Sequence, residues 1–268
     1  MTKIGIIVDR YHLKTKMSEF LTYLKTISDV SIYIEEELLI NYSNINFDED
    51  IFFVKGKGDI ILSFVKMIEN ETSIPIINSY HGIWVAFNRF INCIMLEKAG
   101  IPIPAYSLNP EEEPPPFKNY IIKNLIDQQN DAFKPKIEKR YRSLKVKDER
   151  ALNEKGKYNY FFYQKFIRSK WEYKIYRIGE DYFYYKQLPV LVEPDKMKTR
   201  RTIEPNPELK KLVIKATNTI DLKIASVDFL KSKKGIYYLT DINSTPNFNY
   251  IQNGPVLIGD YIKAQAKR

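Results

Sequence analysis

The chain has 268 residues, 44% of them hydrophobic, which is sufficient for a sizeable core in one large domain or in two or three lobes. Its single cysteine excludes a disulfide scaffold and a cysteine-based zinc site, and no apolar run approaches the roughly 18 residues that a membrane span requires. The formal net charge of +9 favours an anionic partner, and a small anionic substrate is expected rather than nucleic acid, because the aromatic residues fall in strand-like runs where packing accounts for them.

The first 80 residues alternate between strand-like and helix-like patterns. Apolar runs at residues 3–8, 30–34, 50–54 and 74–78 predict strands, and the first of them has the continuous apolar character of a buried parallel strand. Residues 16–27 and 60–68 have the spacing of helices. This alternation predicts an α/β lobe with a parallel sheet.

A basic turn follows the third predicted strand. Its residues, Lys55 to Asp59, include two lysines and two glycines, so backbone amides and ammonium groups can meet an anion there. The turn does not match the Walker pattern, because no Gly-Lys-Ser/Thr sequence closes it. The alternative is an ordinary tight turn with solvated lysines.

The middle of the chain begins with a predicted helix at residues 81–98, which Gly100 ends. Residues 119–124 predict a strand that carries one charge, Lys123. Basic residues follow between positions 134 and 142, and no glycine occurs between Gly100 and Gly156.

The segment from residue 160 onward is expected to form strands and two helices. Residues 160–167 predict a strand, and residues 172–188 predict a strand, a glycine-containing turn and a return strand. Residues 207–222 predict a helix behind this sheet, and residues 254–266 predict a closing helix.

Two β-rich runs, at residues 224–230 and 237–243, flank a Lys/Gly turn and predict a hairpin. Asp228 lies in the first run, and Asp241 and Asn243 lie two residues apart in the second, so these two share a face. Carboxylates among apolar neighbours need a partner, and hard oxygen ligands suit Mg²⁺ that carries phosphates. The alternative is a hairpin whose acidic residues are simply solvated.

Residues 240–246, Thr-Asp-Ile-Asn-Ser-Thr-Pro, together with Asp228, resemble the metal-binding end of the ATP-grasp superfamily. The Asp-Ile-Asn triplet is similar to the one in inositol trisphosphate/tetrakisphosphate kinases, whereas ribosomal-protein glutamate ligases (RimK-like enzymes) mostly carry Glu-x-Asn. Residues 99–104, Ala-Gly-Ile-Pro-Ile-Pro, resemble the usual entry to this domain. Asn247 stands where these families usually have glycine, which leaves the three oxygen ligands intact.

The resemblance covers roughly residues 85–262 and implies the ATP-grasp fold, an α/β (α+β) architecture in which MgATP binds between two lobes. It would divide the chain into an N-terminal parallel α/β lobe (residues 1–80), a central lobe (residues 81–158) and a C-terminal lobe with an antiparallel sheet (residues 159–268). The cofactors it implies are ATP and one or two Mg²⁺ ions, with Mn²⁺ as a substitute.

The same resemblance assigns roles to individual residues. The metal ligands would be Asp228, Asp241 and Asn243. The ATP-binding residues would be Arg89, Lys123 and an adenine hinge made of Gln164, Lys165, Phe166 and Ile167. The catalytic residues would be Lys123, Lys174 and Lys186, and the substrate would contact Lys55, Lys57, Asp59, Lys174 and Ser244.

Two enzyme classes share this machinery. The Asp-Ile-Asn triplet, the Tyr-Lys-Ile-Tyr-Arg-Ile-Gly-Glu sequence at residues 173–180 and the basic turn favour a kinase that transfers the γ-phosphoryl group to an inositol phosphate or another phosphorylated polyol. The alternative is a carboxylate–amine ligase that acts on an amino acid or peptide through an acylphosphate. A second alternative is a non-catalytic nucleotide- or nucleic-acid-binding protein, because the glycine-rich loop that usually covers the phosphates is missing. The start of the sequence lacks a signal-peptide pattern, which predicts a cytoplasmic location.

Overall fold

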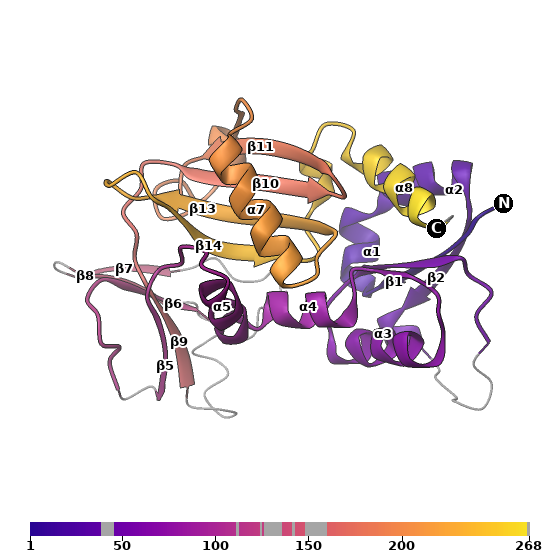
Figure 1. The fold of residues 1–268 in the computed structure, drawn as a ribbon, viewed down its shortest axis with the longest axis horizontal. Coiled ribbons are helices and arrows are strands. Elements are labelled where there is room, and N and C mark those ends of the chain that lie inside the picture. The colour runs from indigo at the N-terminus through magenta and orange to yellow at the C-terminus, as the bar shows by residue number, and fades with distance from the viewer. Residues whose placement is uncertain are drawn as a thin grey trace.

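Three β-sheets with helices packed on them make up the part of the chain that the structure describes (Figure 1). The computed structural model describes residues 1–38, 46–110, 113–123, 125, 136–140, 143–147 and 160–266. Of the helices in these segments, none combines the length and the apolar character needed to cross a membrane.

The N-terminal sheet is parallel, as the alternating pattern predicted, with strand order β2-β1-β3-β4. Its strands are β1 (Lys3–Val8), β2 (Asp29–Ile34), β3 (Ile51–Lys55) and β4 (Ile76–Ile77). Its helices are α1 (Arg10–Lys16), α2 (Ser18–Ile27) and α3 (Asp59–Glu71), with a 3₁₀ turn at Glu35–Glu37. The side chains of α2 and α3 pack against alternate residues of β1 and β3, so both strands are buried on both faces.

Two helices begin where the sequence analysis did not expect a helix to begin, and in each case a side-chain cap explains the start. Residues 10–16, which lie between the first predicted strand and the first predicted helix, form α1, and the carboxylate of Asp9 caps it by accepting a hydrogen bond from the backbone N of His12 at 2.7 Å. The single helix expected at residues 81–98 is two helices, α4 (Tyr80–Phe87) and α5 (Arg89–Lys98). Between them, Asn88 has an extended backbone, and its side chain accepts a hydrogen bond from the backbone N of Ile91 at 3.1 Å.

The central sheet has the strand order β5-β9-β6-β8-β7. Its strands are β5 (Tyr106–Pro110), β6 (Tyr120–Lys123), β7 (Lys136–Arg140), β8 (Ser143–Lys147) and β9 (Tyr160–Lys165). Strand β9 falls in the range that the sequence analysis gave to the C-terminal lobe, yet it pairs with β5 and β6. The proposed lobe boundaries stay a prediction, but the sheet of the C-terminal lobe starts only at Glu172.

The C-terminal sheet is antiparallel, with strand order β12-β11-β10-β13-β14. Its strands are β10 (Glu172–Ile178), β11 (Asp181–Gln187), β12 (Arg201–Thr202), β13 (Ile224–Lys231) and β14 (Tyr237–Asn243), and short 3₁₀ helices occur at Lys196–Thr199 and Phe248–Tyr250. Helix α7 (Pro207–Thr219) packs on one face through a core that includes Val213, Val227 and Phe229. On the opposite face, Tyr176 and Ile178 belong to the same apolar cluster as Ile4 of the N-terminal sheet.

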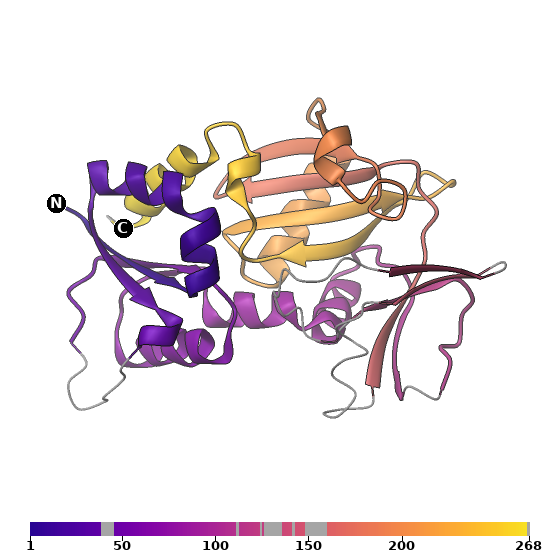
Figure 2. The same ribbon diagram turned by 180° about the vertical axis from the view of Figure 1, so that it is seen from behind.

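The last helix, α8 (Gly254–Gln265), leaves the C-terminal sheet and returns to the N-terminal one. Its buried Ile258 and Ile262 belong to the same apolar cluster as Ile4 and Phe20. The two views in Figures 1 and 2 place α8 beside α2, at the end of the molecule that holds the N-terminal sheet.

Candidate functional site

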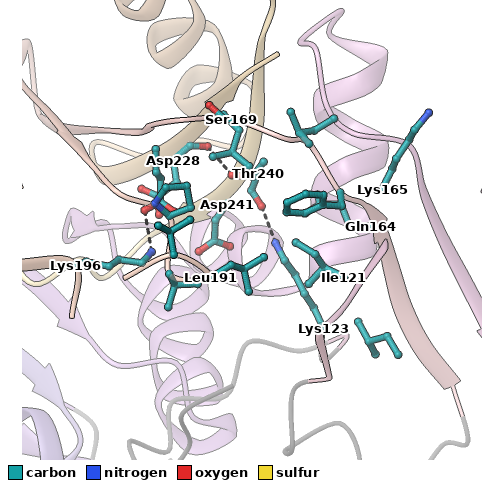
Figure 3. A pocket seen from close by; sticks show the side chains of 18 of the residues that line it. Ile121, Lys123, Gln164, Lys165, Ser169, Leu191, Lys196, Asp228, Thr240 and Asp241 are labelled. Carbon is teal, nitrogen blue, oxygen red and sulfur yellow. Dashed lines mark hydrogen bonds and ion pairs between the residues drawn. The ribbon is translucent and has the colours of Figure 1, made fainter. Parts of the chain in front are cut away.

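A cavity of about 270 Å³ lies where side chains of the central sheet and the C-terminal sheet meet (Figure 3). Part of its wall is apolar and includes Ile122, Phe166 and Leu191, and another part carries charged side chains, among them Lys123 and Asp241. Such a space suits a ligand that joins a flat ring system to anionic groups.

The expected adenine hinge, residues 164–167, lines this cavity. The backbone N of Lys165 donates to the carbonyl O of Ala105, and the backbone N of Phe166 donates to the carbonyl O of Asn119, each at 2.7 Å. These two amides are engaged within the protein, so a base would be held by other backbone groups of the segment. The Lys165 side chain is exposed and points away from the cavity (Figure 3).

Strand β6 brings Lys123 to the charged part of the cavity, which Arg89 also lines. The Nζ atom of Lys123 donates to the carbonyl O of Thr240 at 2.8 Å. Thr240 lies in a β-bulge, because the pairing of β13 with β14 shifts by one residue after the Asp228–Asp241 pair. This contact joins the central sheet to the C-terminal hairpin and places an ammonium group and two carboxylates around one space.

The three expected metal ligands lie close together on the hairpin. Asp228 and Asp241 are directly opposite each other across β13 and β14, and Asn243 lies two residues beyond Asp241 on the same face. In the described part of the chain, no three His, Cys, Asp or Glu side chains group as a metal site, so the third donor would be the Asn243 amide oxygen. Two carboxylates and an amide make an all-oxygen set, which fits Mg²⁺.

Asp228 is 7% exposed and forms an ion pair with Lys174, whose Nζ lies 2.7 Å from its Oδ1. Burial alone would raise the pKa of Asp228, but the charges of Lys174, Lys196 and Arg200, with the hydrogen bond from Lys174, hold that pKa below its ordinary value. Asp228 is therefore ionised at neutral pH, as a metal ligand must be.

Lys186, expected to be catalytic, lies on the face of the sheet opposite to that of Lys174. Lys174 pairs in register with Tyr185, so the next residue on β11 points to the opposite face of the sheet. There the Nζ atom of Lys186 lies 5.2 Å from the centre of the Trp171 ring. Its position does not support the catalytic role that the resemblance implied.

None of the five residues expected to contact the substrate lines the cavity. Lys174 comes nearest to it, because it forms an ion pair with Asp228, which does line the cavity. Lys55 is 1% exposed and donates to the carbonyl O atoms of Thr245 and Pro246 at 2.6 and 2.5 Å, and burial lowers its pKa to about 7. Ser244 is also buried. Lys57 lies in the turn before α3 and is partly exposed, and Asp59 is the exposed first residue of α3.

Sequence reasoning missed the segment that follows β11. Val190, Leu191 and Val192 line the cavity, and Lys196 pairs with Glu172 at 2.8 Å at its edge. The sequence offers one indication of this segment's role, the basic residues at positions 196–201. Its position over the cavity could not be predicted, because no local pattern indicates that it folds back over the sheet. The side chains of the other basic cluster, at residues 134–142, lie outside the described part of the chain.

RimK-like ATP-grasp domains match residues 197–258. The tetrahydromethanopterin:alpha-L-glutamate ligase of Methanocaldococcus jannaschii is 28% identical over 222 residues, which cover 74% of this chain and 72% of that protein.

Solved structures resemble the whole fold. The D-alanine–D-alanine ligase of Bacillus anthracis, complexed with ATP, superimposes with a TM-score of 0.71 at 14% identity and covers 100% of this chain and 98% of its own. A RiPP-associated ATP-grasp ligase of Chryseobacterium gregarium, in complex with ADP and a leader and core peptide, superimposes with a TM-score of 0.68 at 16% identity, over 99% and 97%. These likenesses confirm the ATP-grasp fold.

Proposed function

We propose that this protein of ATP-grasp fold is an ATP-dependent carboxylate–amine ligase, which activates a carboxylate as an acylphosphate and lets an amine displace the phosphate. The named relatives with the same fold are ligases, which supports this class over the kinase that the sequence favoured. The acceptor class that fits is an amino acid or a peptide.

The observation that carries the proposal is the position of three lysines on which the expectation of a polyphosphorylated substrate depended. A polyphosphorylated substrate would need Lys55, Lys57, Lys174, Lys186 and the basic cluster at residues 134–142 to converge on the cleft. Lys55 is buried on two carbonyls, Lys174 is paired with Asp228, and Lys186 lies on the far face of the sheet. The charge that remains in the cavity is suited to the phosphates of ATP and one small carboxylate.

In this proposal, each charged residue of the cavity has a task. Asp228, Asp241 and Asn243 hold Mg²⁺, which would neutralise the phosphates of ATP and support phosphoryl transfer. Lys123 and Arg89 bind phosphate oxygens by charge-assisted hydrogen bonds. The apolar wall at residues 164–167 and 190–192 holds the base and excludes water from the reacting groups.

The test is ADP release from MgATP with glutamate, other amino acids and short peptides, each with hydroxylamine as the amine. An acylphosphate yields a hydroxamate with hydroxylamine, so a ligase should produce ADP and hydroxamate in equal amounts. Asp241→Asn is the control, because it removes one proposed metal ligand from a partly exposed position. ADP release with inositol phosphates alone, without carboxylate and amine, would instead identify a kinase.

A further inference from the structure

Three consecutive backbone carbonyls follow the proposed metal ligand Asn243, and all three accept hydrogen bonds from the N-terminal lobe. The Nδ2 atom of Asn78 donates to the carbonyl O of Ser244 at 2.7 Å. The Nζ atom of Lys55 donates to the next two carbonyls, those of Thr245 and Pro246. Asn78 and Lys55 are each 1% exposed, so neither donor is shared with solvent.

Asn78 also holds the other strand of the metal-binding hairpin. Its Oδ1 atom accepts from the backbone N of Lys223 at 2.8 Å and of Ile224 at 3.0 Å, and its Nδ2 atom donates to the carbonyl O of Ile224 at 2.7 Å. Ile224 is the first residue of β13, the strand that carries Asp228, and Ser244 directly follows β14. One buried amide therefore ties the start of one strand to the end of the other.

The captured segment in turn supports the Asn243 side chain. The backbone N of Thr245 donates to Asn243 Oδ1 at 2.9 Å, so the position of this amide oxygen depends on the backbone conformation at residue 245. Lys55 fixes that conformation from the carbonyl side of the same residue. Lys55 also lies 5.0 Å from the centre of the Phe248 ring, which keeps its ammonium group against this segment.

We infer that Lys55 and Asn78, at the C-terminal ends of β3 and β4, are positioning residues that set the Asn243 oxygen for Mg²⁺. The inference rests on the metal site of the proposed function. It gives Lys55 a different task from the substrate contact that the sequence suggested. Groups that orient metal ligands typically change metal affinity 10- to 100-fold when they are removed.

The experiment measures how much Mg²⁺ is needed for ATP to raise the melting temperature of the full chain. Lys55→Met removes the ammonium group and keeps the apolar stem. Asn78→Asp keeps an acceptor for the amides of residues 223 and 224 but removes the donor to the carbonyl O atoms of Ile224 and Ser244. In both variants, the Mg²⁺ concentration for half of the maximal ATP-dependent shift should rise at least about tenfold.

The matched control is Arg177→Met. Arg177 is also a buried cation, 4% exposed, and donates to a backbone carbonyl, that of Gly179, at 2.7 Å, but it does not touch residues 243–246. Arg177→Met should lower the free energy of unfolding, because it removes a buried cation and its hydrogen bonds, while the Mg²⁺ requirement should stay that of the wild type. An equal rise in the control would mean that any loosening of the fold weakens the metal site, and the inference would be overturned.

The remaining outcomes separate the inference from the ligase proposal. If the two variants need no more Mg²⁺ than the wild type, the inference fails whatever the reaction is. If they need more Mg²⁺ but the wild type makes no hydroxamate, the inference stands and the ligase proposal fails. A wild type whose response to ATP ignores Mg²⁺ would overturn both the metal site and the inference. Should Lys55→Met not fold, the nearly isosteric Asn78→Asp decides alone.

Discussion

Asp228 carries its charge inside the C-terminal sheet, where it has two tasks. It neutralises Lys174, and in the proposed mechanism it also binds Mg²⁺. Removing one partner of a buried ion pair leaves the other charge uncompensated, which costs about 3–5 kcal/mol. Asp241, which is partly exposed, has the second task alone.

We therefore expect Asp228→Asn and Asp241→Asn to differ in stability but not in function. Both should abolish most of the Mg²⁺-dependent binding of ATP. Only Asp228→Asn should lower the free energy of unfolding substantially, by about 3–5 kcal/mol, because it leaves Lys174, whose side chain is only 17% exposed, without its partner. Urea unfolding without nucleotide measures the difference, and equal stability of the two variants would show that the Lys174–Asp228 pair is not energetically significant.

Lys123 is expected to contribute mainly to ATP binding. Lys123→Ala should weaken ATP binding by about 1.5–3 kcal/mol, the range for a hydrogen bond to a charged group, and should nearly stop turnover. Calorimetric titration with ATP would measure the loss. Lys123→Arg should restore little, because a planar guanidinium replaces a compact charge that also reaches the Thr240 carbonyl. Wild-type affinity in Lys123→Ala would reduce this residue to a structural link between sheets.

At the scale of single elements, the break between α4 and α5 positions Arg89. Asn88 caps α5, so Arg89 occupies the first turn of a new helix and reaches the cavity. Asn88→Ala should lower the free energy of unfolding by about 1 kcal/mol, and Asn88→Asp should preserve most of it, because aspartate caps equally well. Thermal unfolding of the two variants tests this. The cap has no role if Asn88→Ala melts at the wild-type temperature.

The elements also show where sequence reasoning succeeded and why it stopped. The parallel N-terminal sheet and the hairpin of Asp228 and Asp241 follow from local apolar patterns, and both are present. The kink at Asn88 was missed, because the apolar face continues across it and only the capping hydrogen bond reveals the break. Lys186 was misplaced, because which face of β11 it occupies depends on the register with β10, a long-range pairing. The local sequence around Lys55 is typical of an exposed basic turn. Lys55 is buried because it donates to the Thr245 carbonyl, 190 positions away, and no local pattern predicts that contact.

At the scale of the whole molecule, the candidate nucleotide site lies between the central sheet and the C-terminal sheet. Lys123 from the central sheet and the carboxylates of the C-terminal sheet surround one cavity. A ligand that binds only the folded state stabilises it by RT ln(1 + [L]/Kd), about 2.7 kcal/mol at 100 times Kd. We expect MgATP at such a concentration to raise the melting temperature clearly, and ATP with EDTA to raise it less. A melting temperature that does not respond to MgATP would leave the fold without the expected nucleotide function.

The return of α8 to the N-terminal sheet affects how the protein is made. The first lobe needs Ile258 and Ile262 to complete the apolar cluster around Ile4 and Phe20. During synthesis on the ribosome, the face of the sheet that α8 covers stays exposed until residues 254–265 have emerged. Exposed apolar surface of this kind makes nascent chains prone to aggregate or to recruit chaperones. A chain that ends at residue 253 should therefore leave residues 1–80 sensitive to proteases, and addition of a peptide with the α8 sequence should restore resistance. Full protection of the truncated chain would show that the first lobe folds without α8.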